Sequence, residues 1–340
     1  MKKEDCFLSK KLTVLVNSCD SYEDLWVPFF TLFLKYWNCV NVRILLNTES
    51  KDFSFDGLDI EVIHYPKENS SYGERMLNCL SSINTPYVLF LLDDFFLRAP
   101  VNTEQISRII NWMDKDKSIV SFSCNVNNTY YDWENEKYPG FRRVPWGNPY
   151  TLTMQAGIWR INKLKKYWRP KISPWEWEEY CNLLTTFHHN DKFYMSNYKS
   201  SRFCEYGYDG AWMGVYHGKW VVEDVEPLFK KEGIAVDYRK RGIYKYEEGL
   251  FHMENAIELD EKDIIKRCLG VRGIIGNILF DLLYPIIPII YEPFMGGYLS
   301  FLKYRAQVKF CKKFNCNVVH VVTKKELLAR LNNRIKKRGD

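Results

Sequence analysis

Several signatures of common enzyme classes are missing from this chain of 340 residues. It contains no GxxxxGK[ST] stretch, which excludes a P-loop enzyme at the level of the motif. No GxGxxG follows the first apolar run, which argues against a dinucleotide oxidoreductase. That first run also does not end in Asp-x-Asp, as a haloacid-dehalogenase-type phosphatase requires.

Paired cysteines and a secretion signal are missing as well. The ten cysteines are scattered, with no CxxC and no Cys–His cluster of zinc-finger spacing. Residues 1–12 lack the long apolar core of a signal peptide. We therefore expect free thiols and a cytoplasmic location.

The chain has no uninterrupted apolar run of the length, about 20 residues, that a spanning helix needs. The nearest approach is 270–302, which Asp281, Glu292 and three prolines interrupt. Residues 303–340 then carry twelve Lys and Arg against two acidic residues. This pattern predicts peripheral association with an anionic membrane surface, and a helical subdomain packed on the core is the alternative. Nucleic-acid binding is not expected, because no recognition motif accompanies the basic segment.

What the chain does have is an alternation of apolar runs and amphipathic stretches in its first part. Such an alternation predicts an α/β, Rossmann-like fold with a doubly wound, mostly parallel sheet. We expect strands over 12–16, 42–46, 60–64, 87–92 and 118–123, and helices over 25–37, 72–83 and 105–113.

The character of the sequence changes after this point. Residues 125–150 are rich in Asn, Tyr, Trp and Pro, which predicts a long loop over a site. Strand-like alternation resumes over 151–161 and a helix starts at 162–168, while Ser173, with Pro174 behind it, predicts the start of a further helix. We expect a domain over 1–245, in halves 1–124 and 125–245, followed by a helical, basic C-terminal extension over 246–340.

Two adjacent carboxylates, Asp93 and Asp94, follow the buried strand in the stretch YVLFLLDDFFL. Burying an unpaired carboxylate is costly, so the pair is expected to have a partner. Ligands of doubly wound sheets bind outside the carboxyl ends of the strands, where Asn17, Ser18 and Asp20 are also expected. A hard cation such as Mg²⁺ or Mn²⁺, shared with phosphate groups, fits this set. A solvated turn is the alternative.

These segments resemble the nucleotide-sugar glycosyltransferases of the GT-A fold, in particular bacterial enzymes that build surface polysaccharides. LLDDFFL looks like a variant of the DxD motif of that family, with adjacent acids in place of Asp-x-Asp. The resemblance covers about residues 10–245 and is carried by 12–20, 74–97, 151–159, 173–180 and 214–242.

The resemblance implies roles for individual residues on the donor side. Asp94 would be the metal ligand, and Asp93 would share the ion or contact the ribose or sugar of the donor. The other nucleotide-sugar contacts that it implies are Asn17, Ser18, Asp20, Arg75, Gln155, Ala156 and Gly157.

A catalytic carboxylate is implied in PWEWEE, at the helix start after Ser173. Glu178 and Glu176 are the candidates for the general base, and Glu178 is favoured because Glu176 lies at the capping position. The alternative is that both only stabilise the helix N-terminus. His217 is a candidate for a further metal contact, with a structural His beside a glycine turn as its alternative. An arginine within 238–242 is a candidate for a diphosphate contact, with a solvated charge run as its alternative.

The sequence therefore predicts a metal-assisted, inverting glycosyltransferase. It would move a sugar from a nucleotide-diphosphate sugar to a glycan or lipid-linked glycan acceptor. One alternative is a non-catalytic, membrane-associated protein that binds a nucleotide sugar or glycan on the same scaffold. Another Mg²⁺-dependent phosphoryl enzyme is the second alternative.

Overall fold

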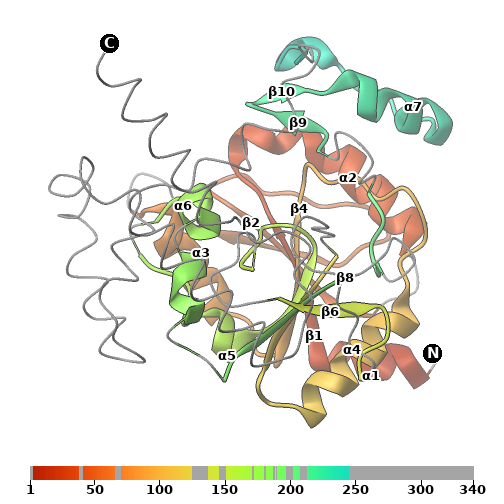
Figure 1. The fold of residues 1–340 in the computed structure, drawn as a ribbon. Helices are drawn as coiled ribbons and strands as arrows, with labels where there is room; N and C mark the ends of the chain where they lie inside the picture. Colours follow the sequence, from red (N-terminus) through yellow and green to blue (C-terminus); the bar gives the residue numbers. More distant parts are fainter. Residues whose placement is uncertain are drawn as a thin grey trace, which may run out of the picture.

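An eight-stranded sheet with helices on both faces forms the centre of the molecule (Figure 1). The strand order is β3-β2-β1-β4-β7-β5-β8-β6, and most of the pairings are parallel. The predicted α/β, Rossmann-like class is confirmed. The computed structural model describes residues 3–37, 41–65, 70–124, 137–144, 151–170, 172–179, 181–186, 188, 190–196, 202–206 and 213–244. The predicted extension over 246–340 lies outside these residues, and its membrane association stays a prediction.

Four parallel strands make the first half of the sheet. They are β1 (Leu12–Asn17), β2 (Arg43–Thr48), β3 (Ile60–His64) and β4 (Tyr87–Leu92), each within two residues of its predicted bounds. In this register Asn17 lies opposite Asn47 of β2 and Leu92 of β4. The carboxyl ends of these neighbouring strands therefore meet at one edge of the sheet.

The second half of the sheet is mixed. It consists of β5 (Ile119–Ser123), β6 (Phe141–Val144), β7 (Gly157–Arg160) and β8 (Lys192–Ser196). β7 is antiparallel to both β4 and β5, between which it lies. The prediction of one loop over 125–150 is wrong for β6, whose four side chains are all buried, while 125–136 and 145–150 lie outside the described residues.

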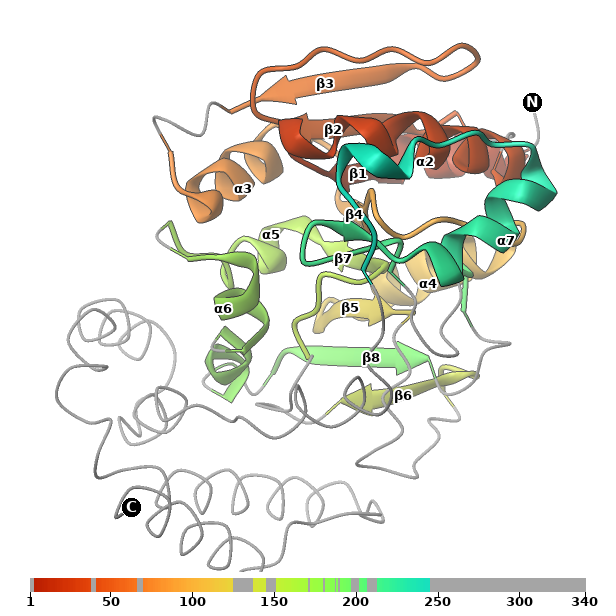
Figure 2. The ribbon, with the colours of Figure 1, turned by 90° about the horizontal axis from the view of Figure 1, so that it is seen from above.

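Two layers of helices cover the sheet, as Figure 2 shows. Successive residues of β1 point to opposite faces, so Val14 and Val16 belong to one apolar cluster and Leu15 to the other. One layer has α1 (Lys3–Lys11), α2 (Glu23–Tyr36), α4 (Thr103–Lys115) and α7 (Val222–Glu232); the other has α3 (Tyr72–Ser81), α5 (Ile161–Leu164) and α6 (Pro174–Glu179). The described residues also contain the 3₁₀ turns η1 (Asp20–Tyr22), η3 (Cys181–Thr186) and η5 (Tyr238–Lys240). Within the described residues, no helix combines the length and the apolar character needed to cross a membrane.

A capping box fixes the start of α3, which supplies two residues of the site described below. The Ser71 hydroxyl accepts a hydrogen bond from Glu74 N at 3.3 Å, and Glu74 Oε2 accepts one from Ser71 N at 2.8 Å. Gly73 packs so closely on the backbone of 169–170 that a Cβ atom would overlap its carbonyl oxygens. The first turn of α3 is therefore held in one position against the segment before α6.

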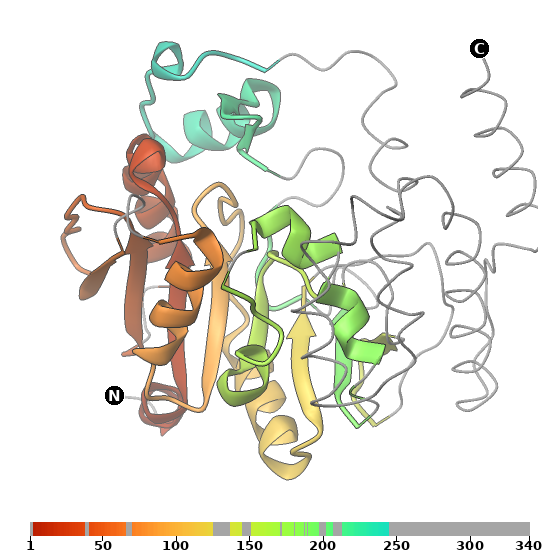
Figure 3. The ribbon, with the colours of Figure 1, turned by 90° about the vertical axis from the view of Figure 1, so that its left-hand side faces the viewer.

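Residues 213–244 lie over the end of the sheet to which the parallel strands point, and they are drawn in teal in Figure 3. They form the hairpin of β9 (Val215–Tyr216) and β10 (Lys219–Trp220), followed by α7 and η5. Gly214 N donates to Asp94 O at 2.6 Å, and a Cβ atom at Gly214 would overlap the Phe96 ring. The hairpin is thereby joined to the turn that carries the paired carboxylates.

Candidate functional site

Two buried asparagines mark the carboxyl ends of β1 and β2. Asn47 Nδ2 donates to Asn17 Oδ1 at 2.8 Å, and Asn17 Nδ2 donates to the Tyr72 hydroxyl at 2.9 Å. Asn17 is 7% exposed and Asn47 is 2% exposed. Because buried amides need hydrogen-bond partners, this chain of bonds fixes the strand ends relative to the start of α3.

Asp93 is held at this edge of the sheet by a hydrogen bond to a neighbouring side chain. One of its carboxylate oxygens accepts a hydrogen bond from Ser18 Oγ, which itself accepts one from Trp26 Nε1 at 2.7 Å. Asp93 is 4% exposed. Burial, together with the charge of Asp94, raises the pKa of Asp93 well above its usual range, and the Ser18 bond opposes this shift.

Asp94 has no comparable partner. Its Oδ1 atom is buried and makes no hydrogen bond. Burial raises the pKa of the Asp94 carboxyl to about 7, while its own backbone N–H and the charge of Arg241 oppose the shift. A buried carboxylate oxygen without a donor costs free energy, and a cation or a hydrogen-bond donor of a ligand can offset this cost.

The raised pKa of Asp94 predicts that stability falls as pH rises. Between the ordinary value of 3.8 and about 7 the unfolded carboxyl is charged while the folded one holds its proton, so the folded state binds more protons. We expect the free energy of unfolding to decrease from pH 5 to pH 8 without divalent cations, and Asp94→Asn to make this decrease smaller. Urea denaturation of both proteins at the two pH values measures the effect. Equal decreases would contradict the assignment.

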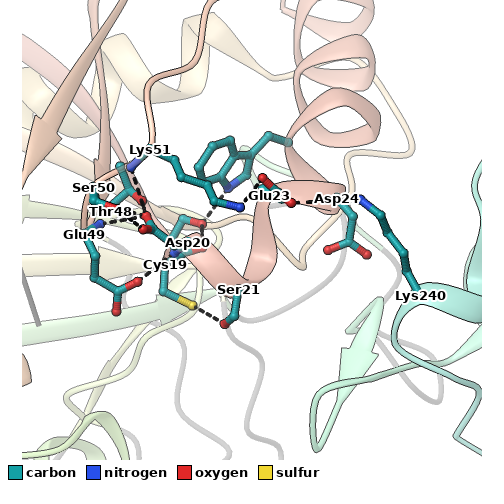
Figure 4. Close-up of polar contacts among 12 residues, drawn as sticks. Cys19, Asp20, Ser21, Glu23, Asp24, Thr48, Glu49, Ser50, Lys51 and Lys240 are labelled. Atoms are coloured by element: carbon teal, nitrogen blue, oxygen red, sulfur yellow. Dashed lines mark hydrogen bonds and ion pairs between the residues drawn. The ribbon is translucent and has the colours of Figure 1, made fainter.

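Asp20 has a structural role that the sequence did not reveal (Figure 4). Its Oδ1 accepts hydrogen bonds from Thr48 Oγ1 at 2.6 Å and from the backbone N–H groups of Glu49, Ser50 and Lys51, at 3.2, 3.0 and 3.2 Å. Its Oδ2 accepts one from Ser50 Oγ. Burial raises the pKa of Asp20, but these bonds outweigh burial and lower it overall. The end of β2 and the turn after it thus supply donors to both oxygens of this carboxylate. Its nucleotide contact stays a prediction, and a nucleotide would have to compete with these donors.

Arg75 and Tyr72 bring α3 to the same edge. Arg75 Nη1 lies 2.9 Å from Glu49 Oε1, and its Nε is buried without a hydrogen-bond partner. Burial raises the pKa of the Tyr72 phenol well above its usual range; Asn17 and Arg75 oppose this, and the Glu178 carboxylate adds to it. Tyr72 therefore contacts both Asn17 and Arg75, and it also responds to the charge of Glu178.

The segment before β7 supplies the predicted donor-sugar contacts. Gln155 is buried, and its Oε1 has no hydrogen-bond partner. Ala156 N donates to the Tyr206 hydroxyl at 2.8 Å, and its carbonyl accepts from Cys124 N at 2.8 Å. A Cβ atom at Gly157 would lie 2.8 Å from Trp159 Nε1, so this glycine serves close packing on the indole. Of the three, Gln155 is the residue whose side chain has a polar atom without a hydrogen-bond partner.

Glu178 connects α6 to that segment. Its Oε1 accepts a hydrogen bond from Met154 N at 2.6 Å, and the residue is half-buried. Pro174 is the first residue of α6, as predicted. The side chain of Glu176 lies outside what the structure describes, so its role as the second candidate base stays a prediction.

His217 lies at the turn of the β9–β10 hairpin. It is exposed, its φ of 49° is in the left-handed region, and its ring contacts Tyr216. Within the described residues, no three His, Cys, Asp or Glu side chains are grouped as a metal centre. Its predicted metal contact therefore stays a prediction.

The residues of this edge fit a cation whose ligands are mostly phosphate oxygens and water molecules and not protein side chains. Mg²⁺ and Mn²⁺ bind through one or two carboxylates, with phosphate oxygens and water completing the shell. Asp94 offers a buried oxygen without a partner, and Asp93 is its neighbour. A cation held in this way does not require a third protein ligand.

Sequence reasoning missed several members of the site. Trp26 and Tyr72 come from helices and contact the strand ends only through the tertiary fold. Asn47 lies in the last two residues of β2 and Glu49 follows the strand, so the rule that ligands gather at strand ends was a signal that could have found them.

Within the stretch 238–242, where an arginine was predicted to contact a diphosphate, Arg241 bonds Asp24, Ser21 and Gly218, and the diphosphate contact stays a prediction.

Comparisons with known proteins give fold similarity only. No family model and no curated protein matches this sequence. Among solved structures, the chain is similar to S. aureus TarS 1–349 in complex with UDP-GlcNAc, with 14% identity over 90% of this chain and 92% of that one, at a TM-score of 0.39. It is also similar to a cytidylyltransferase from Leptospira borgpetersenii, with 12% identity over 70% of this chain and 99% of that one, at a TM-score of 0.37. In a longer TarS structure the match spans only 37% of that chain.

Proposed function

We propose that this protein is a glycosyltransferase that moves a sugar from a nucleotide-diphosphate sugar to a glycan or lipid-linked glycan acceptor in the synthesis of a cell-surface polysaccharide. The observation that carries the proposal is the buried, unpartnered Oδ1 of Asp94 at the carboxyl end of β4. Asn17, at the carboxyl end of β1, and Arg75 both contact Tyr72, and the charge of Glu178 on α6 acts on the same phenol. The carboxyl ends of the strands form the edge at which Rossmann-like sheets bind nucleotides.

The reaction would be a single displacement. The acceptor hydroxyl oxygen forms a bond to the anomeric carbon while the bond from that carbon to the diphosphate breaks, which inverts the configuration. Glu178 takes the proton of the hydroxyl, because one of its oxygens is held by Met154 N and its carboxylate stays oriented. The Nε–H group of Arg75 has no partner, and it can donate a hydrogen bond to a phosphate oxygen.

Asp94, with Asp93 beside it, would hold Mg²⁺ or Mn²⁺. When bound, such a cation supplies positive charge against the departing diphosphate. Asp93 itself stays attached to Ser18, so the side chain of Asp94 is the one free to turn toward a ligand.

A panel of nucleotide sugars tests the function directly. The purified full chain is mixed with each donor and with candidate glycan acceptors, with and without Mn²⁺, and release of nucleoside diphosphate is measured. We expect release with one class of donor only, and more of it when an acceptor is present. No release from any donor contradicts the proposal.

A second function is favoured by the bond between Glu178 and Met154 N, because a carboxylate used for anchoring need not be a base. In that case the protein is a non-catalytic, membrane-associated module that binds a nucleotide sugar or glycan. Thermal stabilisation by one donor, with no turnover on any acceptor, would support this function instead.

Replacing His217 by asparagine tests its predicted metal contact without disturbing the turn. Asparagine tolerates the left-handed conformation that φ of 49° requires, so the hairpin is expected to form as before. If the imidazole binds the cation, the Mn²⁺ concentration for half-maximal activity is expected to rise roughly tenfold or more. Titration of activity with Mn²⁺ gives the answer. An unchanged titration would leave His217 as a turn residue only.

A further inference from the structure

Arg241 joins the end of the 213–244 segment to η1 and to the first turn of α2. Its Nε donates to Asp24 Oδ2 at 3.0 Å, while Nη2 donates to the other Asp24 oxygen and to Ser21 O, the latter at 2.8 Å. Its Nη1 donates to Gly218 O at 3.2 Å. The guanidinium side chain is only 9% exposed. One planar group therefore holds a carboxylate and two carbonyls from distant parts of the chain.

The same guanidinium lies over Tyr22, 4.5 Å from the ring centroid. Burial raises the pKa of Tyr22 to about 12, the charges of Asp94 and Asp93 add to this shift, and the charge of Arg241 opposes it. Tyr22 is therefore within electrostatic range of both the arginine and the paired carboxylates. The guanidinium is itself held by Ser21, the residue before Tyr22, and by Asp24 in the first turn of α2.

The hairpin is held at both of its ends. At its base, Gly214 N donates to Asp94 O at 2.6 Å, and Val221 N donates back to Gly214 O at 2.9 Å. Near its tip, the carbonyl of Gly218 is held by Arg241 at 3.2 Å. Without Arg241, the base stays attached to Asp94 while the tip loses this bond.

We propose that Arg241 is a positioning residue of the site. It clamps the tip of the β9–β10 hairpin to Tyr22 and so fixes the position of the hairpin beside the Asp93–Asp94 turn. The position of the hairpin then determines where the donor binds. The kinetic part of this inference rests on the proposed function. Lysine cannot replace the arginine, because a single ammonium does not reach three acceptors in the geometry of a planar fork.

Two substitutions and one matched control test the clamp. The variants are Arg241→Lys and Arg241→Met; the control is Arg108→Met on α4, whose side chain is 52% exposed and pairs with Glu104. Hydrogen exchange is measured over 213–221 and 20–24, with β8 as the internal reference, and donor KM and kcat are measured with the full chain. We expect both Arg241 variants to raise exchange in the two segments and to raise donor KM by about tenfold to 10²-fold, with a smaller change in kcat. The control is expected to match wild type in every measurement.

The outcomes separate positioning from general support of the fold. A loss of folded protein lowers kcat and melting temperature together and leaves KM unchanged, and that result overturns the proposal. Unchanged exchange in both segments also overturns it, as does raised exchange with an unchanged KM. If Arg241→Met does not fold, Arg241→Lys carries the test. If wild type turns over no donor, the proposed function has failed, and the exchange result alone then decides whether the clamp exists.

Discussion

Replacing Asp94 by alanine is expected to lower sugar transfer by about 10³-fold or more, which corresponds to several kcal/mol of lost charge stabilisation. The reason is that Asp94 carries the buried oxygen without a partner at the carboxyl end of β4. Release of nucleoside diphosphate from the active donor measures the loss. The free energy of unfolding above pH 7 is expected to stay the same or to rise, because the substitution removes a buried charge that no donor compensates.

The control for this substitution is Asp59→Ala, since Asp59 is an exposed acidic residue before β3. It is expected to leave both activity and stability at the wild-type level. If Asp94→Ala retains wild-type activity, the carboxylate pair does not serve a ligand and the enzymatic assignment fails. If Asp94→Ala instead unfolds the protein, the pair is a structural feature of the turn.

Replacing Glu178 by glutamine is expected to reduce kcat by roughly 10²- to 10⁴-fold, the usual contribution of a general base. Glutamine keeps a carbonyl oxygen that can accept the hydrogen bond from Met154 N, so the link between α6 and the segment before β7 is preserved. What is lost is the ability to take a proton. Steady-state kinetics with the active donor and acceptor measure the change.

A comparison with Glu178→Ala separates the two roles of this residue. Alanine removes the base and the anchor, so it is expected to lower stability as well as kcat, whereas glutamine lowers kcat alone. Glu226→Gln, on α7 and paired with Lys230, is the neutral control. If glutamine at position 178 supports full activity, Glu178 only anchors Met154, and another group must act as the base.

The strands that the sequence predicted well are those with long apolar runs. β1 and β4 are almost entirely buried, so their residues form continuous runs of Val, Leu and Phe. β6 was missed because Arg142 and Arg143 are buried in it, which hides its apolar character. β8 was missed because its apolar run is only Phe193, Tyr194 and Met195, between Lys192 and Ser196.

The site was predictable where it follows strand ends and unpredictable where it depends on distant contacts. Asp93 and Asp94 could be placed because a carboxylate pair after a buried strand is a local pattern. The bond from Asn17 to Tyr72 joins residues 55 positions apart, and that from Arg241 to Asp24 joins residues 217 apart. The saturation of Asp20 likewise depends on how the turn after β2 folds back over it, which no local spacing reveals.

The reversed direction of β7 decides which parts of the chain can build this rim. The last residues of β1, β2 and β4 lie at this rim. Because β7 runs the other way, its first residue and the segment before it lie there instead. Gln155 and Met154 therefore reach the rim on an incoming stretch whose course is fixed by Glu178 and Tyr206 and not by the first half of the sheet. Substitutions in that incoming stretch can therefore change the contacts predicted for the donor sugar, while β1 and β4, which place Asn17 and Asp94, remain as they are.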